Sequence, residues 1–429
     1  MKQLNLEKQL MNNYDSKHDY DGISGKRLAY RLGEISNIGL TKEGGSNRPG
    51  FSHEEKQAKE LVIGWMNEAG LDVRMDGAGN VFGRLEGKKD LPAIISGSHV
   101  DSVPNGGHFD GPLGVLTALE VVEAWNETGY RPEKPFEVVI FTDEEGARFN
   151  GGFGGSEAMI GIADMEKKLT LQDSAGLSFE EVLQDVGLTV GEYVASKRNL
   201  DEIEMFIEVH IEQGKRLEKE KLPCGIVTGI AGPCWLEFTF TGEAGHAGNT
   251  PMYDRKDALV AASEFIQAVS KLPKQISDSA VATIGKIQVE PNGVNVIPGS
   301  VTLYVDIRDI YKQTRDDLIK SVLHTGTSVA EKHGVTVESI EKMRVDPVPI
   351  EEAKQELLEK SCHAKGINAY KLPSGAGHDA MVVGEKLPIA MLFVQSKDGV
   401  SHSPSEWSEL NDCMETVHVL KHFVESLQA

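Results

Sequence analysis

Four short apolar runs, each followed by a polar loop, constrain the fold of this chain more than any other feature. The runs read LPAIISGSH, PFEVVIFTDEE, MFIEVHIEQG and LPIAMLFVQ, and a helical pattern, LGVLTALEVVEAWNETG, lies between the first two. Short apolar runs that alternate with helices are typical of buried strands in a parallel sheet with helices on both faces. The sequence therefore predicts an α/β fold with a mostly parallel sheet.

The interval from about Gly225 to Arg344 has a different pattern. It runs strand, helix, strand, strand, helix, strand, with alternating polarity in segments such as WLEFTFTGEAG and SVTLYVDIRDI. This order is typical of a small α+β sandwich. A chain of 429 residues is also too long for one ordinary core. We therefore predict a first domain of residues 1–224 plus 345–429 and an inserted domain of residues 225–344.

The composition argues against several classes of function. The formal net charge of −22 disfavours a nucleic-acid partner, because phosphate binding needs a basic face. The N-terminal segment lacks the apolar core of a signal peptide, and no apolar stretch reaches the length of about 18 residues that a membrane span needs. The four cysteines form no C-x-x-C pair and are interpreted as buried thiols. We expect a cytoplasmic protein that acts on a small molecule and binds neither membrane nor nucleic acid.

Five residues that could bind metal lie at the ends of apolar runs or in the loops that follow them. Taken singly, a histidine at a strand end is more often structural, and an aspartate before glycine is more often a turn former. Their shared position favours a functional interpretation, because open α/β sheets place their active sites beyond the carboxyl ends of the strands. The five residues are His99, Asp110, Glu145, His210 and His402.

Additional carboxylates extend the hypothesis from metal binding to hydrolysis. Asp101 lies two positions after His99, so it is placed to accept the second N–H of that ring. Asp110 lies among glycines and has two oxygens, so it is the candidate that bridges two metal ions. Glu144 and Glu145 are adjacent, and we assign metal binding to Glu145 and general-base catalysis to Glu144.

Three polar residues of the inserted domain are further candidates. His246 lies among small residues in GEAGHAGNTP, where its ring could reach a substrate oxygen. Asn295 in NGVNVIPG and Arg308 in LYVDIRD could bind substrate, or they could be a turn former and a surface charge. The sequence leaves both alternatives open.

The motifs, in their order along the chain, resemble the amidase/hydantoinase/carbamoylase branch of the binuclear zinc aminoacylase and carboxypeptidase superfamily. The resemblance extends from about Lys26 to the C-terminus and rests on GSHVDS, NGGHFDGPLGV, FTDEEGARF, EVHIEQG, GHAGNTPM, GVNVIPG, SGAGHDA and VSHSPSEW. His210 itself favours this branch, because the peptidase branches usually have aspartate at this position. The first 25 or so residues have no recognised counterpart in the family.

The resemblance implies a role for each motif residue. It implies that the inserted domain forms the homodimer and closes over the substrate, and that the centre holds two divalent metal ions, with zinc first and manganese, cobalt or nickel as alternatives. The implied metal ligands are His99, Asp110 as bridge, Glu145, His210 and His402; the catalytic residues are Glu144, Asp101 and His246; the substrate-binding residues are Gln213, Asn295, Arg308, Gly377 and His378.

The implied activity is hydrolysis of the carbamoyl C–N bond of an N-carbamoyl-L-amino acid, which yields the L-amino acid, ammonia and carbon dioxide. Allantoate and N-carbamoyl-β-alanine also combine a ureido group with a carboxylate, so allantoate amidohydrolase and β-ureidopropionase are alternatives. A dipeptidase or aminoacylase could use the same metal pair. A catalytically silent binding protein is disfavoured, because such proteins typically lack a ligand or the base and here all are present.

Overall fold

The computed structural model describes residues 5–428 and divides into two compact units. The large unit comprises Met1–Val227, Ile350–Leu372 and His378–Ala429, and the inserted unit comprises Thr228–Pro349 and Pro373–Gly377. Each unit has a hydrophobic core of its own. The sequence placed the inserted domain at residues 225–344 and did not assign the short segment 373–377 to it.

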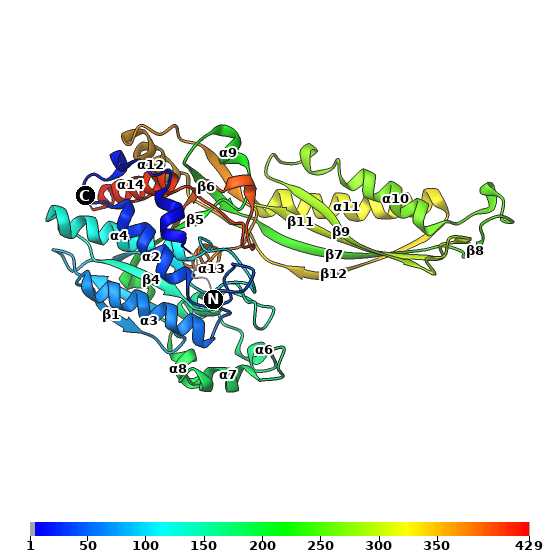
Figure 1. The fold of residues 1–429 in the computed structure, drawn as a ribbon. Coiled ribbons are helices and arrows are strands. Elements are labelled where there is room, and N and C mark those ends of the chain that lie inside the picture. Colours follow the sequence, from blue (N-terminus) through cyan, green and yellow to red (C-terminus); the bar gives the residue numbers. More distant parts are fainter. Residues whose placement is uncertain (1–4, 429) are drawn as a thin grey trace. The chain divides into compact units, whose positions relative to one another are not determined.

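A mixed sheet forms the centre of the large unit, and its middle strands are the four predicted apolar runs (Figure 1). β3 (Ala93–His99) lies parallel to β4 (Phe136–Phe141) on one side and to β5 (Ile203–Ile211) on the other. β5 also pairs in parallel with β15 (Ile389–Val394). Every residue of β3, β4 and β15 is buried, as expected for strands covered on both faces. The α/β fold class with parallel central strands is confirmed.

Antiparallel strands continue this sheet on both sides. The full order is β1-β2-β4-β3-β5-β15-β6-β13, with β14 beside β6. The outer strands are β1 (Asp72–Met75), β2 (Val81–Leu85), β6 (Cys224–Ile230), β13 (Val348–Pro349) and β14 (Lys371–Ser374). The segment IVTGIAG, which the sequence assigned to the inserted domain, thus contributes to β6 of the large sheet. Six of the seven β6 residues are buried, so this strand lacks the one-sided exposure of the inserted sheet.

One helix, α4 (Pro112–Thr128), forms the centre of the helical layer against β3 and β5. Its start follows from Gly111 at φ +83° and Pro112 at the first helical position, and Gly129 at φ +71° ends it. α2 and α14 pack against α4, while α5 and α13 contact β4 and β5 respectively. The other helices of the large unit are α1 (Leu6–Met11), α2 (Gly25–Ser36), α3 (His53–Glu68), α5 (Gly154–Ile160), α6 (Met165–Lys168), α7 (Phe179–Asp185), α8 (Val190–Ala195), α9 (Arg216–Glu220), α12 (Glu352–Ala364), α13 (Asp379–Val383) and α14 (Leu410–Ser426).

The N-terminal segment, for which the family offered no counterpart, packs against the C-terminal helix α14. Leu6 and Leu10 of α1 are buried in the core of the large unit. His18 Nδ1 lies 3.2 Å from Glu415, and the His418 ring nitrogen Nε2 lies 2.9 Å from the His18 carbonyl oxygen. Residues 5–25 therefore belong to the folded large unit.

The inserted unit is a four-stranded antiparallel sheet with two helices on one face (Figure 1). Its strand order is β12-β7-β11-β9. Buried and half-buried residues alternate along β11, as expected for a sheet that is covered on one face. The elements are β7 (Gly232–Thr241), α10 (Ala258–Val269), β9 (Val281–Glu290), β11 (Ser300–Asp309), α11 (Lys312–His333) and β12 (Thr336–Arg344), with a separate two-stranded sheet of β8 (Gly245–His246) and β10 (Val296–Ile297). This is the predicted order of strands and helices. Within residues 5–428, no helix has the length and apolar character of a membrane span.

Candidate metal centre and active site

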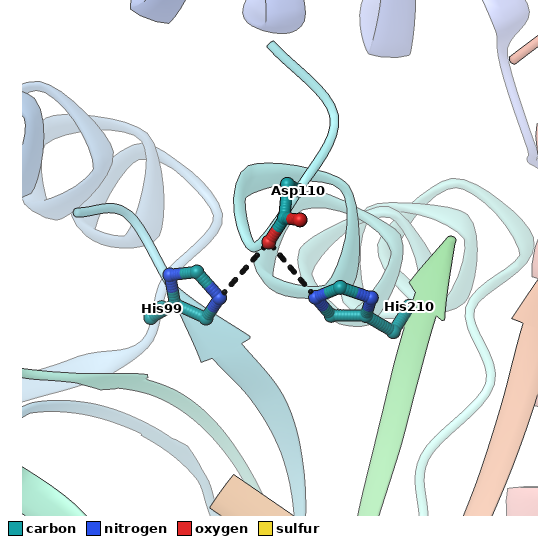
Figure 2. Close-up of side chains that lie close together, drawn as sticks. All are labelled: His99, Asp110 and His210. Atoms are coloured by element: carbon teal, nitrogen blue, oxygen red, sulfur yellow. Dashed lines mark hydrogen bonds and ion pairs between the residues drawn. The ribbon is translucent and has the colours of Figure 1, made fainter. Parts of the chain in front are cut away.

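The five predicted ligands lie together at the carboxyl ends of the central strands. His99 is the last residue of β3, His210 is the penultimate residue of β5, and Asp110 immediately precedes the turn into α4. Glu145 follows β4, and His402 lies in the loop after β15. Figure 2 shows His99 and His210 on neighbouring strands with Asp110 between them. Parallel strands bring these side chains to one edge of the sheet, as the sequence predicted.

Asp110 is shared by two groups of potential ligands. One oxygen, Oδ1, lies 3.1 Å from His210 Nε2 and 3.5 Å from His99 Nε2. The other oxygen, Oδ2, lies 3.5 Å from His402 Nε2, and His402 Nε2 lies 3.4 Å from Glu145 Oε2. In each group the three ligand atoms lie within 4.8 Å of one another. This geometry fits two metal positions that share one carboxylate.

The two groups differ in exposure. His99 and His210 are buried, whereas the His402 side chain is 49% exposed. His402 also has a left-handed backbone, with φ at +53°, which is uncommon for a residue with a side chain. The first position, at His99, Asp110 and His210, is therefore enclosed, and the second, at Asp110, Glu145 and His402, is open to solvent.

The orientation of the histidine rings fits metal binding. His99 Nε2 is buried and has no hydrogen-bond partner among residues 5–428, although a buried polar atom normally has one. The opposite nitrogen, Nδ1, lies 3.3 Å from the Asp101 carboxylate and 3.2 Å from the Asp101 carbonyl oxygen. His210 Nδ1 lies 3.0 Å from the Ile211 carbonyl oxygen in the same way. Such contacts favour a proton on Nδ1 and turn the Nε2 lone pair towards the shared carboxylate, as in metal-binding histidines.

The charges of the centre are strongly coupled. Burial alone would lower the pKa of His99, but Glu144 and the neighbouring aspartates raise it well above its usual value. A hydrogen bond with Asp110 raises the pKa of His402 to about 9. Burial, together with the negative charge of Asp110, raises the pKa of Glu145 to about 8. Protons on these groups must leave before a cation can bind, so binding of divalent metals here releases protons.

Glu144 and Glu145 are held by one residue but face different groups. Asp101 accepts hydrogen bonds from the backbone N–H of Glu144 (3.2 Å) and of Glu145 (3.1 Å). The Glu144 carboxylate lies 3.6 Å from His99 Nε2, beside the enclosed position, while Glu145 lies beside His402. Burial, which His99 only partly offsets, and the negative charge of Glu145 raise the pKa of Glu144 well above its usual value. Glu144 thus lies outside both ligand groups, in surroundings that favour a proton on its carboxyl group.

The predicted substrate residues of the large unit lie beside the centre. Gln213 donates a hydrogen bond from its amide nitrogen to Asp110 Oδ2 at 2.7 Å. Its amide oxygen is buried and has no hydrogen-bond partner. His378 is buried, and its ring centroid lies 4.4 Å from that of His210. Burial and the adjacent His210 hold the pKa of His378 well below its usual value, so its ring is neutral. Gly377 ends the segment 373–377, which belongs to the inserted unit.

The inserted unit brings two of its three predicted residues together. His246 on β8 and Asn295, which directly precedes β10, lie at the two-stranded sheet, where the Ala247 N–H donates to the Asn295 carbonyl oxygen at 3.0 Å. His246 Nδ1 accepts from the backbone N–H groups of Gly248 (3.1 Å) and Asn249 (3.2 Å). The neutral ring therefore carries its proton on Nε2, which is free to act as a donor on the exposed side.

Arg308 lies apart from this pair within the same unit. It is on β11, eight positions beyond Ser300, and a strand of that length spans about 27 Å at ~3.4 Å per residue. The two-stranded sheet lies at the Ser300 end of the four-stranded sheet, where the Gly242 N–H donates to the Gly299 carbonyl oxygen (Figure 1). The Arg308 guanidinium makes a bidentate contact with Asp306 (3.0 and 2.8 Å) and donates to the Gly375 carbonyl oxygen at 2.6 Å.

Known proteins place this chain in a family. The family model of peptidase family M20/M25/M40 matches residues 95–426. The chain belongs to this family. It is 43% identical over 406 residues to an N-carbamoyl-L-amino acid amidohydrolase of Geobacillus stearothermophilus, covering 94% of this chain and 99% of that protein. It is 36% identical to an allantoate amidohydrolase of Bacillus subtilis, covering 87% of this chain and 90% of that protein.

Solved structures of other proteins agree with this fold. A hydantoinase/carbamoylase family amidase from Burkholderia multivorans superposes with a TM-score of 0.88 at 35% identity and covers 94% of this chain and 98% of its own. An aminopeptidase PepT from Bacillus cereus superposes with a TM-score of 0.67 at 17% identity, which supports a common fold only. The resemblance to the amidase/hydantoinase/carbamoylase branch is therefore confirmed.

Two buried carboxylates near the centre were missed by the sequence analysis. Glu406 accepts the backbone N–H of Phe109 and of Asp110, and Glu208 accepts the Ser98 hydroxyl at 2.7 Å and the Ala380 N–H at 2.8 Å. Both residues stand inside motifs that were recognised, HSPSEW and EVHIEQG. Their partners are distant in sequence, however, so only the folded chain identifies what they hold.

Proposed function

We propose that this M20/M25/M40 member hydrolyses the carbamoyl C–N bond of N-carbamoyl-L-amino acids. The observation that carries the proposal is the shared Asp110 carboxylate between two ligand groups, with the unliganded carboxylate of Glu144 beside them. The substrate class is supported by the extensive similarity to N-carbamoyl-L-amino acid amidohydrolases of G. stearothermophilus and, at 41% identity, of Pseudomonas. The products are the L-amino acid, ammonia and carbon dioxide.

The proposed centre holds two divalent metal ions, with zinc as the first candidate and manganese, cobalt or nickel as alternatives. Metal ions at these ligands supply Lewis acidity and lower the pKa of bound water towards about 7. Mixed imidazole and carboxylate ligands accept all four metals, and availability influences which is bound.

In the proposed reaction Glu144 transfers the proton. It accepts a proton from the attacking water while the oxygen forms a bond to the ureido carbon. It then delivers this proton to the amino-acid nitrogen as the C–N bond breaks, so the base is regenerated. The carbamic acid that remains decomposes to ammonia and carbon dioxide. Asp101 fixes the backbone of Glu144 and the ring of His99, and thereby sets the distance between base and ligand group.

The remaining polar residues are proposed to bind the substrate. Gln213 is held by Asp110 through its amide nitrogen, so its unpaired carbonyl oxygen is directed to accept a ureido N–H. The planar guanidinium of Arg308 can bind the substrate carboxylate through two hydrogen bonds, in place of its present contact with Asp306. His246 offers Nε2–H as a donor to the developing oxyanion, and Asn295 and the segment of Gly377 and His378 complete the set.

The proposal includes a homodimer formed through the inserted unit. A small ureido acid cannot span the roughly 27 Å of β11 between the Ser300 end and Arg308. His246 and Arg308 of one chain are therefore proposed to serve different active sites, which a dimer can provide. The edge strands β12 and β9 and exposed apolar residues such as Trp235 (45%) and Ile287 (47%) support an interface on this unit.

Mixed dimers test this arrangement. Glu144→Gln and His246→Ala chains carry different purification tags and are co-expressed, and the doubly tagged heterodimer is isolated. If His246 acts in the partner's site, one of the two sites regains both wild-type residues, and activity returns. A heterodimer as inactive as its two parents, or a monomer in analytical ultracentrifugation, contradicts the dimer proposal.

The main alternative substrate is allantoate, which is favoured by the 36% identity to the B. subtilis allantoate amidohydrolase. β-Ureidopropionate and dipeptide or N-acetyl substrates are further alternatives within the same metal chemistry. A cytoplasmic location is part of the proposal and agrees with four buried cysteines that form no disulfide.

A substrate panel tests the function. Protein purified without chelators is analysed for metal and assayed for product with N-carbamoyl-L-methionine, N-carbamoyl-D-methionine, allantoate, N-carbamoyl-β-alanine, N-acetyl-L-methionine and a dipeptide. We expect the highest kcat/KM for the N-carbamoyl-L-amino acid. Turnover of allantoate alone, or of none of the ureido acids, rejects the proposal.

A further inference from the structure

Glu406 is a buried carboxylate that no part of the proposed chemistry uses. It is 3% exposed and lies four positions after His402. Its Oε1 accepts hydrogen bonds from the backbone N–H of Phe109 at 2.9 Å and of Asp110 at 3.1 Å. Among residues 5–428, no lysine or arginine forms an ion pair with it. Its partners are therefore the backbone that carries the shared ligand, and not a compensating cation.

The chain is shaped to admit this carboxylate. A Cβ atom at Gly107 would lie 2.0 Å from the Glu406 carboxyl carbon, which is closer than atoms can approach. Only glycine at position 107 lets the carboxylate reach the N–H groups of residues 109 and 110. The loop GGHFDG is thus built around the side chain of a residue almost 300 positions later.

The other oxygen of Glu406 faces the loop that carries His402. Oε2 lies 2.9 Å from Ser401 Oγ, and the same hydroxyl lies 2.9 Å from Asp110 Oδ2. The Glu406 N–H donates to the Ser403 carbonyl oxygen at 3.0 Å, which closes a turn immediately after His402. The Glu406 side chain therefore contacts two of the three loops that supply ligands to the exposed metal position.

This position needs such support more than the enclosed one. His99 and His210 stand on paired strands, whereas His402 stands in a half-exposed loop with a left-handed backbone. The separation of Asp110 and His402 is not set by strand pairing. It is set by the contacts of Glu406 and Ser401.

We propose that Glu406 is a positioning residue that holds the Asp110 loop and the His402 loop together and thereby forms the exposed metal position. This inference rests on the proposed metal centre. Glu406 acts through the hydrogen-bond acceptors that it presents and through its length. Its contribution falls on the metal held by Asp110, Glu145 and His402, and the enclosed metal at His99 and His210 is retained without it.

Three substitutions at position 406 separate length from charge. In Glu406→Gln the amide oxygen still accepts both backbone N–H groups, and the amide nitrogen donates to Ser401 Oγ. In Glu406→Asp the charge remains, but the carboxylate is withdrawn by about one C–C bond, ~1.5 Å. Glu406→Ala removes all contacts. Glu409→Ala, three positions later, is the control, because its half-buried side chain makes no capping hydrogen bond.

Metal-free variants are titrated with Co²⁺ alone, and binding is followed by calorimetry and by the visible absorption of the bound ion. We expect two ions per chain for wild type, Glu406→Gln and Glu409→Ala. In Glu406→Asp and Glu406→Ala we expect the first ion to bind as in wild type and the second to bind about 10–100-fold more weakly, the usual effect of removing a residue that orients a ligand. Thermal unfolding identifies any variant that fails to fold. If Glu406→Ala fails to fold, the comparison of Glu406→Gln with Glu406→Asp still tests the positioning role.

Several results would overturn the inference. Wild-type affinity for the second ion in Glu406→Asp and Glu406→Ala would make Glu406 dispensable. Loss of the second ion in Glu406→Gln would show that charge, and not position, is required. A wild-type chain that binds a single Co²⁺ would remove the metal pair itself. Failure of the substrate panel leaves these titrations unchanged, so the function and the positioning role are tested separately.

Discussion

The adjacent carboxylates Glu144 and Glu145 provide the sharpest test of the proposed chemistry. Glu144→Gln keeps the size of the side chain and removes only its ability to accept a proton. Glu144 is 7% exposed, so water cannot readily replace the lost base. General-base catalysis contributes about 10²–10⁴-fold to rate, and we therefore expect kcat to fall by that factor, which corresponds to a rise of ~2.7–5.5 kcal/mol in activation free energy.

The metals are expected to stay bound in Glu144→Gln. Glu144 is outside both ligand groups, and its backbone N–H remains bonded to Asp101. KM for the ureido acid should change little, since the ground-state contacts are made by other residues. Initial rates across a substrate series, together with metal analysis of the same sample, measure both quantities.

Glu145→Gln is the matched control with the opposite outcome. Glu145 lies 3.4 Å from His402 and belongs to the exposed ligand group. We expect this variant to lose one of its two metals and to regain part of its activity at high metal concentration. If Glu144→Gln retained its metals and kept full kcat, or if it lost a metal as Glu145→Gln does, the assignment of Glu144 as base would be wrong.

Three further predictions concern stability. Removal of metal by a chelator should lower the Tm in calorimetry, because ligand at 100 times its Kd stabilises a fold by about 2.7 kcal/mol, and re-addition of metal should restore it. The Phe265 ring is buried, and its centroid lies 4.7 Å from that of Phe238, so Phe265→Ala should lower the free energy of unfolding of the inserted unit by about 3–5 kcal/mol in denaturant titrations. Leu259 on the same helix is 36% exposed, and Leu259→Ala should lower it by about 1 kcal/mol or less. Burial lowers the pKa of His418 to about 4, below its ordinary value in the unfolded chain, so the stability that its neutral form contributes is complete above about pH 6.5 and is lost as the pH falls towards 4. Unfolding curves at several pH values should show a smaller pH dependence in His418→Gln than in wild type, and identical slopes would contradict this.

The sequence predicted where the five candidate ligands lie, because the end of a buried strand leaves a local record in the sequence. A buried strand in a parallel sheet is a short apolar run, and the residue after it must lie at the carboxyl edge with its neighbours. His99 and His210 end such runs, and the structure places them on neighbouring strands. The two oxygens of Asp110 suggested a bridge, and the structure divides them between two ligand groups. The alternating polarity of the inserted domain likewise predicted its one-sided antiparallel sheet.

Hydrogen bonds between distant loops leave no such record. In the sequence, Glu406 has the features of a surface glutamate next to Trp407. The adjacent residues do not indicate that the N–H groups of residues 109 and 110 donate to its carboxylate. Strand β6 likewise pairs with β15 of the large sheet at its first residues, while the chain from Thr228 onward belongs to the inserted unit. The local sequence does not indicate either pairing.

What the sequence determined by itself is the position of the candidate groups: apolar runs that end in imidazoles and carboxylates bring these side chains to one edge of a parallel sheet. What only the tertiary structure decided is how these groups are divided. Folding assigned one oxygen of Asp110 to His99 and His210 and the other to His402, and it placed His246 and Arg308 at opposite ends of one sheet. The physical reason is that strand periodicity fixes the direction of a side chain, whereas its partners depend on which loops meet after the whole chain has packed.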